Sequence, residues 1–470
     1  MRSRFARHLR SVLSGGPSSV GMLRAARAAR PPISPELDGH QYAIFLLRVA
    51  AGIEHALMAQ YLYAAYSLGG PTVVERHRAT ILGWQETILG IAKEEMGHLI
   101  TVQNVLRLIS GPISFDREDF PFDAAFYPFD FTLEKLTRAS LAKYVYAEKP
   151  PDWSGPLADE ITKLATAANH EAAPNAVSKL YELMIETLAD PEIVPDRAFR
   201  AETRSTQGSW SEWGRGYAHG ERGNTHGASP AGSPDLIIRV MSSRQDAVDA
   251  LREIAEQGEG TTLTDPAHSH FQRFLTIYQQ FAELETAADF HPTRPVATNP
   301  VVEDALSEHP SHNACTVITH PVTFYWAHLL NVRYRLLLSG LTHVFQSAAA
   351  SARPTARSEL ITLVFGEMYK LRGLSSVLVE MPAHRGGDAA HAAAGPPFEM
   401  PYTVNIPLRE VDRWRWHLSM LTASRGILEH LVADDDPARR AFAAAIRDGD
   451  RALIERIERV IAGLEPGDMT

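Results

Sequence analysis

Two long helix-forming segments near the start of the chain constrain its fold more than any other feature. From Gln41 to Leu68, apolar residues recur at steps of three and four, and a Gly-Gly-Pro sequence at 69–71 ends the run. A second segment with the same period runs from about Val74 to Leu108 and stops near Gly111. Each segment is long enough to form one leg of a helical bundle.

Weaker patterns predict further helices along the rest of the chain. A third bundle helix fits Asn175–Leu188, and a fourth begins at Ser243, an N-cap with Asp246 three residues on. The segments between them, 115–131 and 203–235, are expected to be loops. More helices are predicted at Phe324–Phe345, Ser358–Met381, Arg409–Leu431 and Pro437–Leu464. The predicted fold class is therefore all-α, a four-helix bundle with additional C-terminal helices.

These patterns divide the chain into three parts. Residues 1–35 carry many arginines and no acid, since the first acidic residue is Glu36. A disordered tail, a transit-like amphipathic segment and a surface-binding arm are all compatible with this composition, and we favour the tail. Residues 36–290 are expected to form the bundle, and residues 291–470 a helical region packed on it.

Composition excludes several classes of protein. The chain has 470 residues, of which 45% are hydrophobic, and its net charge of -10 argues against nucleic-acid binding. Cys315 is the single cysteine, so neither an intrachain disulfide nor a thiolate metal site is expected, and we expect a cytoplasmic protein. No uninterrupted apolar stretch approaches the ~18 residues of a membrane span.

The first two helices place acids and an imidazole on their apolar faces. Glu54 lies on the stripe that the first helix should bury, where an unpaired carboxylate costs several kcal/mol. On the second helix, Glu95 and His98 form a Glu-x-x-His pair, which shares one face with apolar residues. Glu94 and His55 lie one position off these stripes, so we expect them to be solvated or to stand behind the ligands.

The remaining ligands are less clearly indicated. The third helix offers Glu182 or Glu186; we prefer Glu182, although an exposed side chain is as compatible with the pattern. The fourth offers Glu256 and Glu259 at the same i, i+3 spacing, with a carboxylate where a second histidine is expected. His268 and His270 follow; we prefer His270 as a ligand, and loop histidines without a metal are the alternative. Three further histidines are expected to lie in a metal-free loop: His309, His312 and His320.

This set of side chains predicts a metal site. Di-iron carboxylate bundles use one Glu from each of two helices and Glu-x-x-His from each of the other two. Oxygen and imidazole ligands without thiolate suit iron or manganese. We therefore expect iron, two ions per chain, with manganese as the alternative. The predicted ligands are Glu54, Glu95, His98, Glu182, Glu256, Glu259 and His270.

Two segments resemble a known family. Residues 53–63 (IEHALMAQYLY) and 91–99 (IAKEEMGHL) look like the ferritin-like domain of the iminophenylpyruvate dimer synthase family. The sequence EQGEG at 256–260, followed by His270 and Phe271, and the sequence AGPPFE at 394–399 also resemble it. The likeness covers most of the chain from Pro35 to about Leu431, although Lys179 replaces an expected polar or acidic residue.

The resemblance implies a function as well as a ferritin-like four-helix bundle. That family includes enzymes of violacein- and rebeccamycin-type pathways, which oxidatively couple imines derived from aromatic amino acids and are much longer than this chain. We therefore expect a non-haem di-iron oxidase or oxygenase of secondary metabolism, with Glu54, Glu95 and His98 as catalytic residues. Its expected partners are a small amine or imine and dioxygen or peroxide; a homo-oligomer or a pathway-enzyme partner stays open.

Two alternatives belong to other classes of protein. The first is an iron-binding ferroxidase or storage protein, which is disfavoured because shell-forming ferritins are short single bundles. The second is a metal-free helical partner of a pathway enzyme. Metal content and the response of the melting temperature to Fe(II) distinguish these alternatives, because binding to the folded state raises that temperature.

Overall fold

The computed structural model describes most of the chain beyond its N-terminal segment. It covers residues 36–118, 127–172, 174–215, 217, 219, 234–261, 266–302, 315–347 and 356–464. The predicted tail at 1–35 lies outside the described residues, as do His309 and His312. Apart from two strands of two residues each, the described elements are helices, so the predicted all-α fold is confirmed.

The chain divides into two compact units, Met1–Thr293 and Arg294–Thr470. Among its described residues, the α-helices of the first unit are α3 (Gly39–Ser67), α4 (Glu75–Leu108), α5 (Arg138–Glu148), α6 (Pro156–Ala168), α7 (Val177–Ala189), α8 (Trp210–Trp213), α9 (Arg244–Glu259) and α10 (His270–Leu284). Three short 3₁₀ helices accompany them: η2 (Asp196–Ala198), η3 (Ala201–Thr206) and η4 (Pro266–His268).

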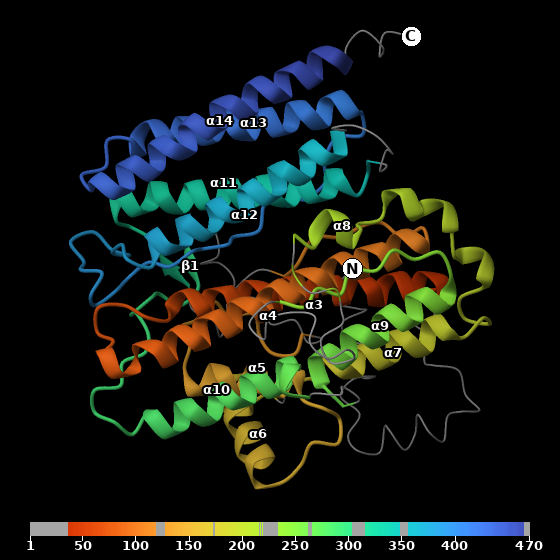
Figure 1. Cartoon of the computed structure of the whole chain (residues 1–470), viewed down its shortest axis with the longest axis horizontal. Coiled ribbons are helices and arrows are strands. Elements are labelled where there is room, and N and C mark those ends of the chain that lie inside the picture. Colours follow the sequence, from red (N-terminus) through yellow and green to blue (C-terminus); the bar gives the residue numbers. More distant parts are fainter. Residues whose placement is uncertain are drawn as a thin grey trace. The chain divides into compact units, whose positions relative to one another are not determined.

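Helices α3 and α4 form the centre of the first unit (Figure 1). Asp38 caps α3 in a capping box with Gln41, and the helix gives way to Gly69 and Gly70, which have positive φ angles of 90° and 111°. Positive φ is accessible to glycine without a steric penalty, so the chain turns sharply here into α4. The two long helices pack along one another and bury most of their facing side chains.

The other two legs of the bundle are each made of two shorter helices. In Figure 1, α5 and α10 lie under one half of the α3–α4 pair, and α7 and α9 lie under the other half. Helix α5 packs on α10, α7 packs on α9, and α9 and α10 both contact α4. The third leg is therefore α5 followed by α7, and the fourth is α9 followed by α10.

This division corrects one prediction and confirms another. The sequence analysis assigned the third leg to a single helix near 175–188 and did not predict α5 or α6. Ser243 does cap α9, in a capping box with Asp246. That helix ends at Gly260, whose left-handed conformation (φ 74°) places its N–H on the carbonyl of Glu256.

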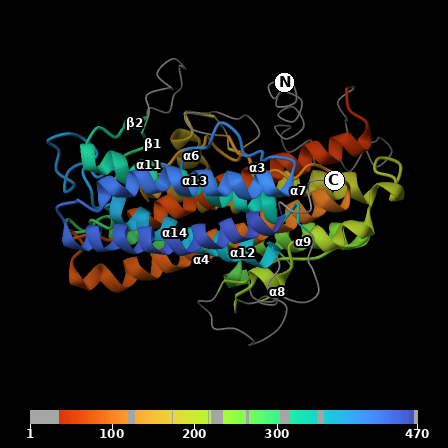
Figure 2. The ribbon, with the colours of Figure 1, turned by 90° about the horizontal axis from the view of Figure 1, so that it is seen from above.

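The second unit is a separate group of four helices, which run alongside one another in Figure 2. They are α11 (Pro321–Val344), α12 (Ala356–Leu378), α13 (Glu410–Leu431) and α14 (Pro437–Leu464). His320 caps α11 by accepting a hydrogen bond from the Thr323 N–H. Two short parallel strands, β1 (Pro300–Val301) and β2 (Thr316–Val317), precede α11, with Pro300 paired to Thr316.

One helix among the described residues has the length and hydropathy of a membrane-crossing segment. It is α3, and 78% of its apolar window is buried inside the protein. Such burial is what a core helix of a bundle requires.

Candidate metal centre

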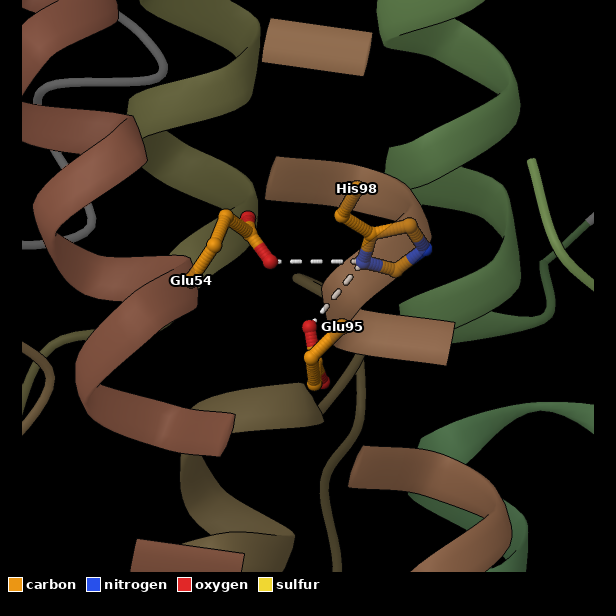
Figure 3. A group of neighbouring side chains, drawn as sticks. All are labelled: Glu54, Glu95 and His98. Carbon is orange, nitrogen blue, oxygen red and sulfur yellow. Dashed lines mark hydrogen bonds and ion pairs between the residues drawn. The ribbon is translucent and has the colours of Figure 1, made fainter. Parts of the chain in front are cut away.

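Helices α3 and α4 bring the three strongest predicted ligands together (Figure 3). His98 Nδ1 lies 3.0 Å from Glu95 Oε2 and 3.3 Å from Glu54 Oε2. All three side chains are buried, with 3% exposure or less. Their ligand atoms lie within 4.8 Å of one another, so they can converge on one ion.

A second group of three shares Glu95 with the first. It contains His270, whose Nδ1 is 3.0 Å from Glu95 Oε1 and 3.8 Å from Glu148 Oε2. These ligand atoms also lie within 4.8 Å of one another. Because the two oxygens of Glu95 face different histidines, Glu95 is placed to bridge two ions.

The site lies where both shorter legs of the bundle are interrupted. Glu148 is the last residue of α5, and Ser178 stands at the start of α7. Glu259 is the last residue of α9, and His270 is the first residue of α10. Helix ends bring Glu148 and His270 close to Glu95, which lies within α4, and Ser178 and Glu259 line the cavity beside it.

Burial and charge set the protonation of the first group. Burial, followed by the charge of Glu95, raises the pKa of Glu54 to about 8. Burial alone would lower the pKa of His98, but its interactions with Glu54 and Glu95 outweigh burial and raise that pKa to about 10. In the metal-free protein, protonated His98 therefore supplies positive charge between the carboxylates.

The second group is balanced in the same way. Burial opposes ionisation of Glu95, but His270 and His98 hold the pKa of its carboxyl well below the usual range. Burial opposes protonation of His270, but Glu95, Glu148 and Glu94 raise the pKa of its imidazole well above the usual value. Metal binding would replace these histidine protons.

The residues present fit a metal better than they fit one another. Glu54 Oε2, Glu95 Oε1 and His270 Nδ1 are buried and have no hydrogen-bond partner among the described residues. Glu95 Oε1 and His270 Nδ1 are close, yet they lack the alignment of a hydrogen bond. Buried polar atoms are normally paired, so these three atoms are available to share a cation. The oxygen and imidazole donors suit iron or manganese.

Two buried tyrosines hold two of the carboxylates. Tyr181 of α7 donates a hydrogen bond to Glu54 Oε1. Tyr61 of α3 donates to Glu148 Oε1 over 2.7 Å. The sequence analysis did not include Glu148, so the acceptor of Tyr61 comes from the structure alone. Each tyrosine fixes one carboxylate oxygen and leaves the other directed at a histidine.

A cavity opens beside the first group of ligands. Its volume is about 20 Å³, roughly the space of one water molecule, and Glu54, Glu95, His98 and Glu148 line it. Apolar side chains complete the wall: Leu57, Ala147, Val177, Ile254 and Ala255. The cavity therefore has room for a water-sized molecule next to these predicted ligands.

Not all predicted ligands lie at this cavity. Glu182 and Glu186 are exposed on α7, and Glu256 is half-buried and accepts a hydrogen bond from Thr261 over 2.9 Å. None of these three lines the cavity. Glu259 does line it, and burial, followed by the charge of Glu182, raises its pKa to about 8.

Two residues at the site differ from the prediction. Glu148 was missed, although Leu141, Tyr144, Val145 and Glu148 have helical spacing that could have indicated a buried acid. Glu94 is buried with 1% exposure, so the expectation of a solvated side chain is wrong. His55 is likewise fully buried. Glu94 accepts a hydrogen bond from His270, so the alternative expectation, that Glu94 stands behind a ligand, agrees with the structure.

Comparisons with known proteins agree with this architecture. The family model described as ferritin-like matches residues 47–279. Dichlorochromopyrrolate synthase of Lentzea aerocolonigenes is 31% identical over 78% of this chain and 36% of its own length. The 2-imino-3-(indol-3-yl)propanoate dimerase of Chromobacterium violaceum is 25% identical over 80% of this chain and 36% of its own length. The chain thus spans about a third of the length of these curated relatives.

A solved structure is also similar. It is a ferritin-like protein from Caulobacter vibrioides, 15% identical, and the match covers 78% of this chain and 99% of that one with a TM-score of 0.41.

Proposed function

Because residues 47–279 belong to the ferritin-like family, we propose that this protein is a metal-dependent enzyme that oxidises or couples small, amino-acid-derived amines or imines. The observation that carries the proposal is the pair of buried ligand groups that share Glu95. One group contains Glu54 and His98, and the other contains Glu148 and His270. Two carboxylate-bridged ions are the arrangement that such a pair of groups supports.

Iron is the proposed metal, two ions per chain, with manganese as the alternative. Iron bound with open coordination positions supplies electron transfer to dioxygen or peroxide. The chain's own residues hold and orient the ligands. Tyr181 fixes Glu54, Tyr61 fixes Glu148, and Glu95 belongs to both groups. Apolar residues such as Leu57 and Ile254 limit the water at the cavity wall.

The names of the relatives suggest the substrate class. One is a dimerase of an indolyl imino acid, and the other is a synthase of dichlorochromopyrrolate. Joining two such imines by a new C–C bond removes two hydrogen atoms. These reduce dioxygen to hydrogen peroxide, or hydrogen peroxide to two molecules of water. We propose the same class of oxidative reaction at the metal centre of this chain.

The decisive experiment combines metal loading with oxidant consumption. Protein purified without oxygen is loaded with Fe(II), and its iron content and optical spectrum are measured before and after oxygen is added. The probe substrate is the imine that an amino-acid oxidase generates from L-tryptophan; dimer formation is followed by mass spectrometry. We expect about two irons per chain by the bundle rule, and oxidant consumption that depends on the imine.

Variants and alternative outcomes make the test specific. Glu95→Ala should abolish metal retention, because both groups lose their shared ligand. Glu86→Gln, an exposed change on the same helix, should retain it. Oxidation of Fe(II) far in excess of the bound ions would instead indicate a ferroxidase. A metal-free protein whose melting temperature does not change when Fe(II) is added would indicate a helical partner protein.

A further inference from the structure

The two histidines of the centre differ in what holds the nitrogen that faces away from it. His98 and His270 both turn Nδ1 toward Glu95. On the far side, His98 Nε2 donates to the side-chain oxygen of Gln257 over 2.8 Å. His270 Nε2 donates to Glu94 Oε2 over 3.2 Å. One imidazole is therefore backed by a neutral amide and the other by a carboxylate.

A single residue fixes both of these acceptors through its main chain. The Asp235 N–H donates to Glu94 Oε1 over 2.8 Å. Its carbonyl accepts from Gln257 Nε2, also over 2.8 Å. Because the Gln257 NH₂ group is committed to this carbonyl, its oxygen must face His98. Both imidazoles thus carry a proton on Nε2 and can offer a lone pair on Nδ1.

The acceptor behind His270 is a carboxyl group that is itself paired with a guanidinium. Glu94 is buried and forms an ion pair with Arg273. The Glu94–Arg273 pair has no net charge, and neither has Gln257, so their long-range fields are comparable. What differs is the hydrogen bond itself, because a carboxylate withdraws the Nε2 proton more strongly than an amide does.

In other respects the two ligand groups match closely. Both include Glu95, and each adds one carboxylate that accepts a tyrosine hydrogen bond: Glu54 from Tyr181 and Glu148 from Tyr61. Each also contains one histidine that presents Nδ1. Apart from the cavity and Glu259, which lie beside the first group, the acceptor behind the histidine is the main difference between the two potential metal positions.

We infer that the two metal positions are unequal: the position at His270 binds a divalent metal more tightly than the position at His98 and fills first, because Glu94 backs its imidazole. A carboxylate behind a ligating histidine makes the ring a stronger donor, and loss of such a partner typically weakens metal binding about 10- to 100-fold. Glu94 and Asp235 are positioning residues in this scheme. The inference rests on the metal centre of the proposed function and not on its substrate.

Single-histidine variants test the order of affinities. In His98→Ala the position at His270 remains, and in His270→Ala the position at His98 remains. Anaerobic calorimetric titration with Fe(II), repeated with Co(II) to follow the visible spectrum, gives one dissociation constant for each. We expect His98→Ala to bind at least about 10-fold more tightly than His270→Ala. Equal affinities, or the reverse order, would overturn the inference.

A second change distinguishes positioning from structural damage. Glu94→Gln should weaken Fe(II) binding by about 10- to 100-fold in the His98→Ala background. In the His270→Ala background it should change the dissociation constant little, since Glu94 does not contact His98. Equal weakening in both backgrounds would show that Glu94 acts only on the fold. Circular dichroism of each metal-free variant verifies that it remains helical.

Failure of this inference is distinguishable from failure of the proposed function. A wild-type chain that binds no Fe(II) or Co(II) contradicts both. If the wild-type chain binds two ions with the same affinity, the inference of unequal positions is wrong, but the proposed metal centre is not contradicted.

Discussion

At the scale of residues, the buried charges of the first unit compensate one another. Glu54, Glu95 and Glu148 surround two histidines, and Arg273 neutralises Glu94 behind them. Buried ionised groups are tolerated only when they are paired or bind a cation. Removing one member of this set should therefore reduce metal binding at the centre, whereas removing a nearby exposed carboxylate should not.

Glu148→Gln should lower metal content, with the loss at the position that contains His270. The amide removes a charged oxygen within 3.8 Å of His270 Nδ1 but keeps the side-chain volume. Glu182→Gln is the matched control, since Glu182 is exposed on α7 and does not line the cavity. Iron per chain, measured by elemental analysis after gel filtration, provides the readout. If Glu182→Gln lost as much metal as Glu148→Gln, the assignment of ligands would be wrong.

A second residue-scale prediction concerns the pH dependence of the second unit. Burial and, next, the charge of His343 lower the pKa of His417 to about 3, although the charge of Glu410 acts in the opposite direction. Below pH ~6.5, the ordinary pKa of histidine, the unfolded chain gains a proton that folded His417 does not. Its contribution is therefore fully present above that pH and is lost as pH falls toward 3, by about 1.4 kcal/mol per pH unit.

His417→Gln removes this contribution to the pH dependence. Urea unfolding of the full chain at pH 7 and pH 5, followed by tryptophan fluorescence, should show a smaller loss of stability on acidification in the variant. Glu410 and His343, which hydrogen-bond in series to His417, are unchanged in both proteins. An equal loss in the two proteins would mean that His417 is protonated in the folded state.

The sequence predicted the part of the site that lies on regular helices. Glu54, Glu95 and His98 stand within long periodic segments, where the apolar stripe indicates which side chains face inward. Glu259 and His270, which stand at helix ends, were also predicted, from their spacing and neighbouring residues. Glu148 was missed, because it stands at the end of α5, where the period stops and the direction of a side chain depends on tertiary contacts. Glu182 was preferred because it lies next to Tyr181, but one position along a helix turns a side chain by ~100°.

At the scale of elements, an extended segment lies against α4 and supports the centre. Thr101 of α4 donates to the carbonyl of Ile237 over 2.6 Å, and Asn104 donates to the carbonyl of Arg239 over 2.7 Å. Gly97 allows this close approach, because a Cβ at Gly97 would lie 3.3 Å from the Ile237 nitrogen. The segment includes Asp235, which holds the acceptors behind both histidines.

Two glycine-to-alanine changes on α4 should therefore have opposite effects. Gly97→Ala should destabilise the first unit and weaken metal binding, because the added methyl presses on backbone rather than on a flexible side chain. Gly83→Ala should stabilise the helix by about 1 kcal/mol, since Ala is the better helix former, and no atom lies within 4 Å of its new Cβ. Thermal unfolding of the metal-free proteins measures both effects. Stabilisation by Gly97→Ala would show that the segment is not tightly held.

Helix prediction succeeded where the period was long and failed where burial was complete. Helices α3 and α4 were predicted within two residues at both ends. Helix α5 was missed because most of its residues are buried on every side, which removes the polar face that an amphipathic pattern needs. The strong cap at Ser243 marked the start of α9 even though the preceding segment is irregular.

At the scale of the whole chain, metal binding should act on stability through the first unit, which contains the proposed ligands. Fe(II) added without oxygen should raise the melting temperature of the wild-type chain, since a ligand at 100 times its dissociation constant stabilises by about 2.7 kcal/mol. A chelator should reverse the shift, and Glu95→Ala should not show it. Scanning calorimetry provides the measurement. A shift of full size in Glu95→Ala would place the metal elsewhere.

The interrupted legs of the bundle have a consequence for how such a protein can diversify. Continuous helices would enclose the two ligand groups on every side, whereas here α5 and α9 end beside them and α7 and α10 begin beside them. Insertions between those helix ends would change what reaches the ligands without altering the register of α3 and α4. New substrate preferences can therefore arise between these helix ends, while α3 and α4 keep the arrangement of the ligands constant.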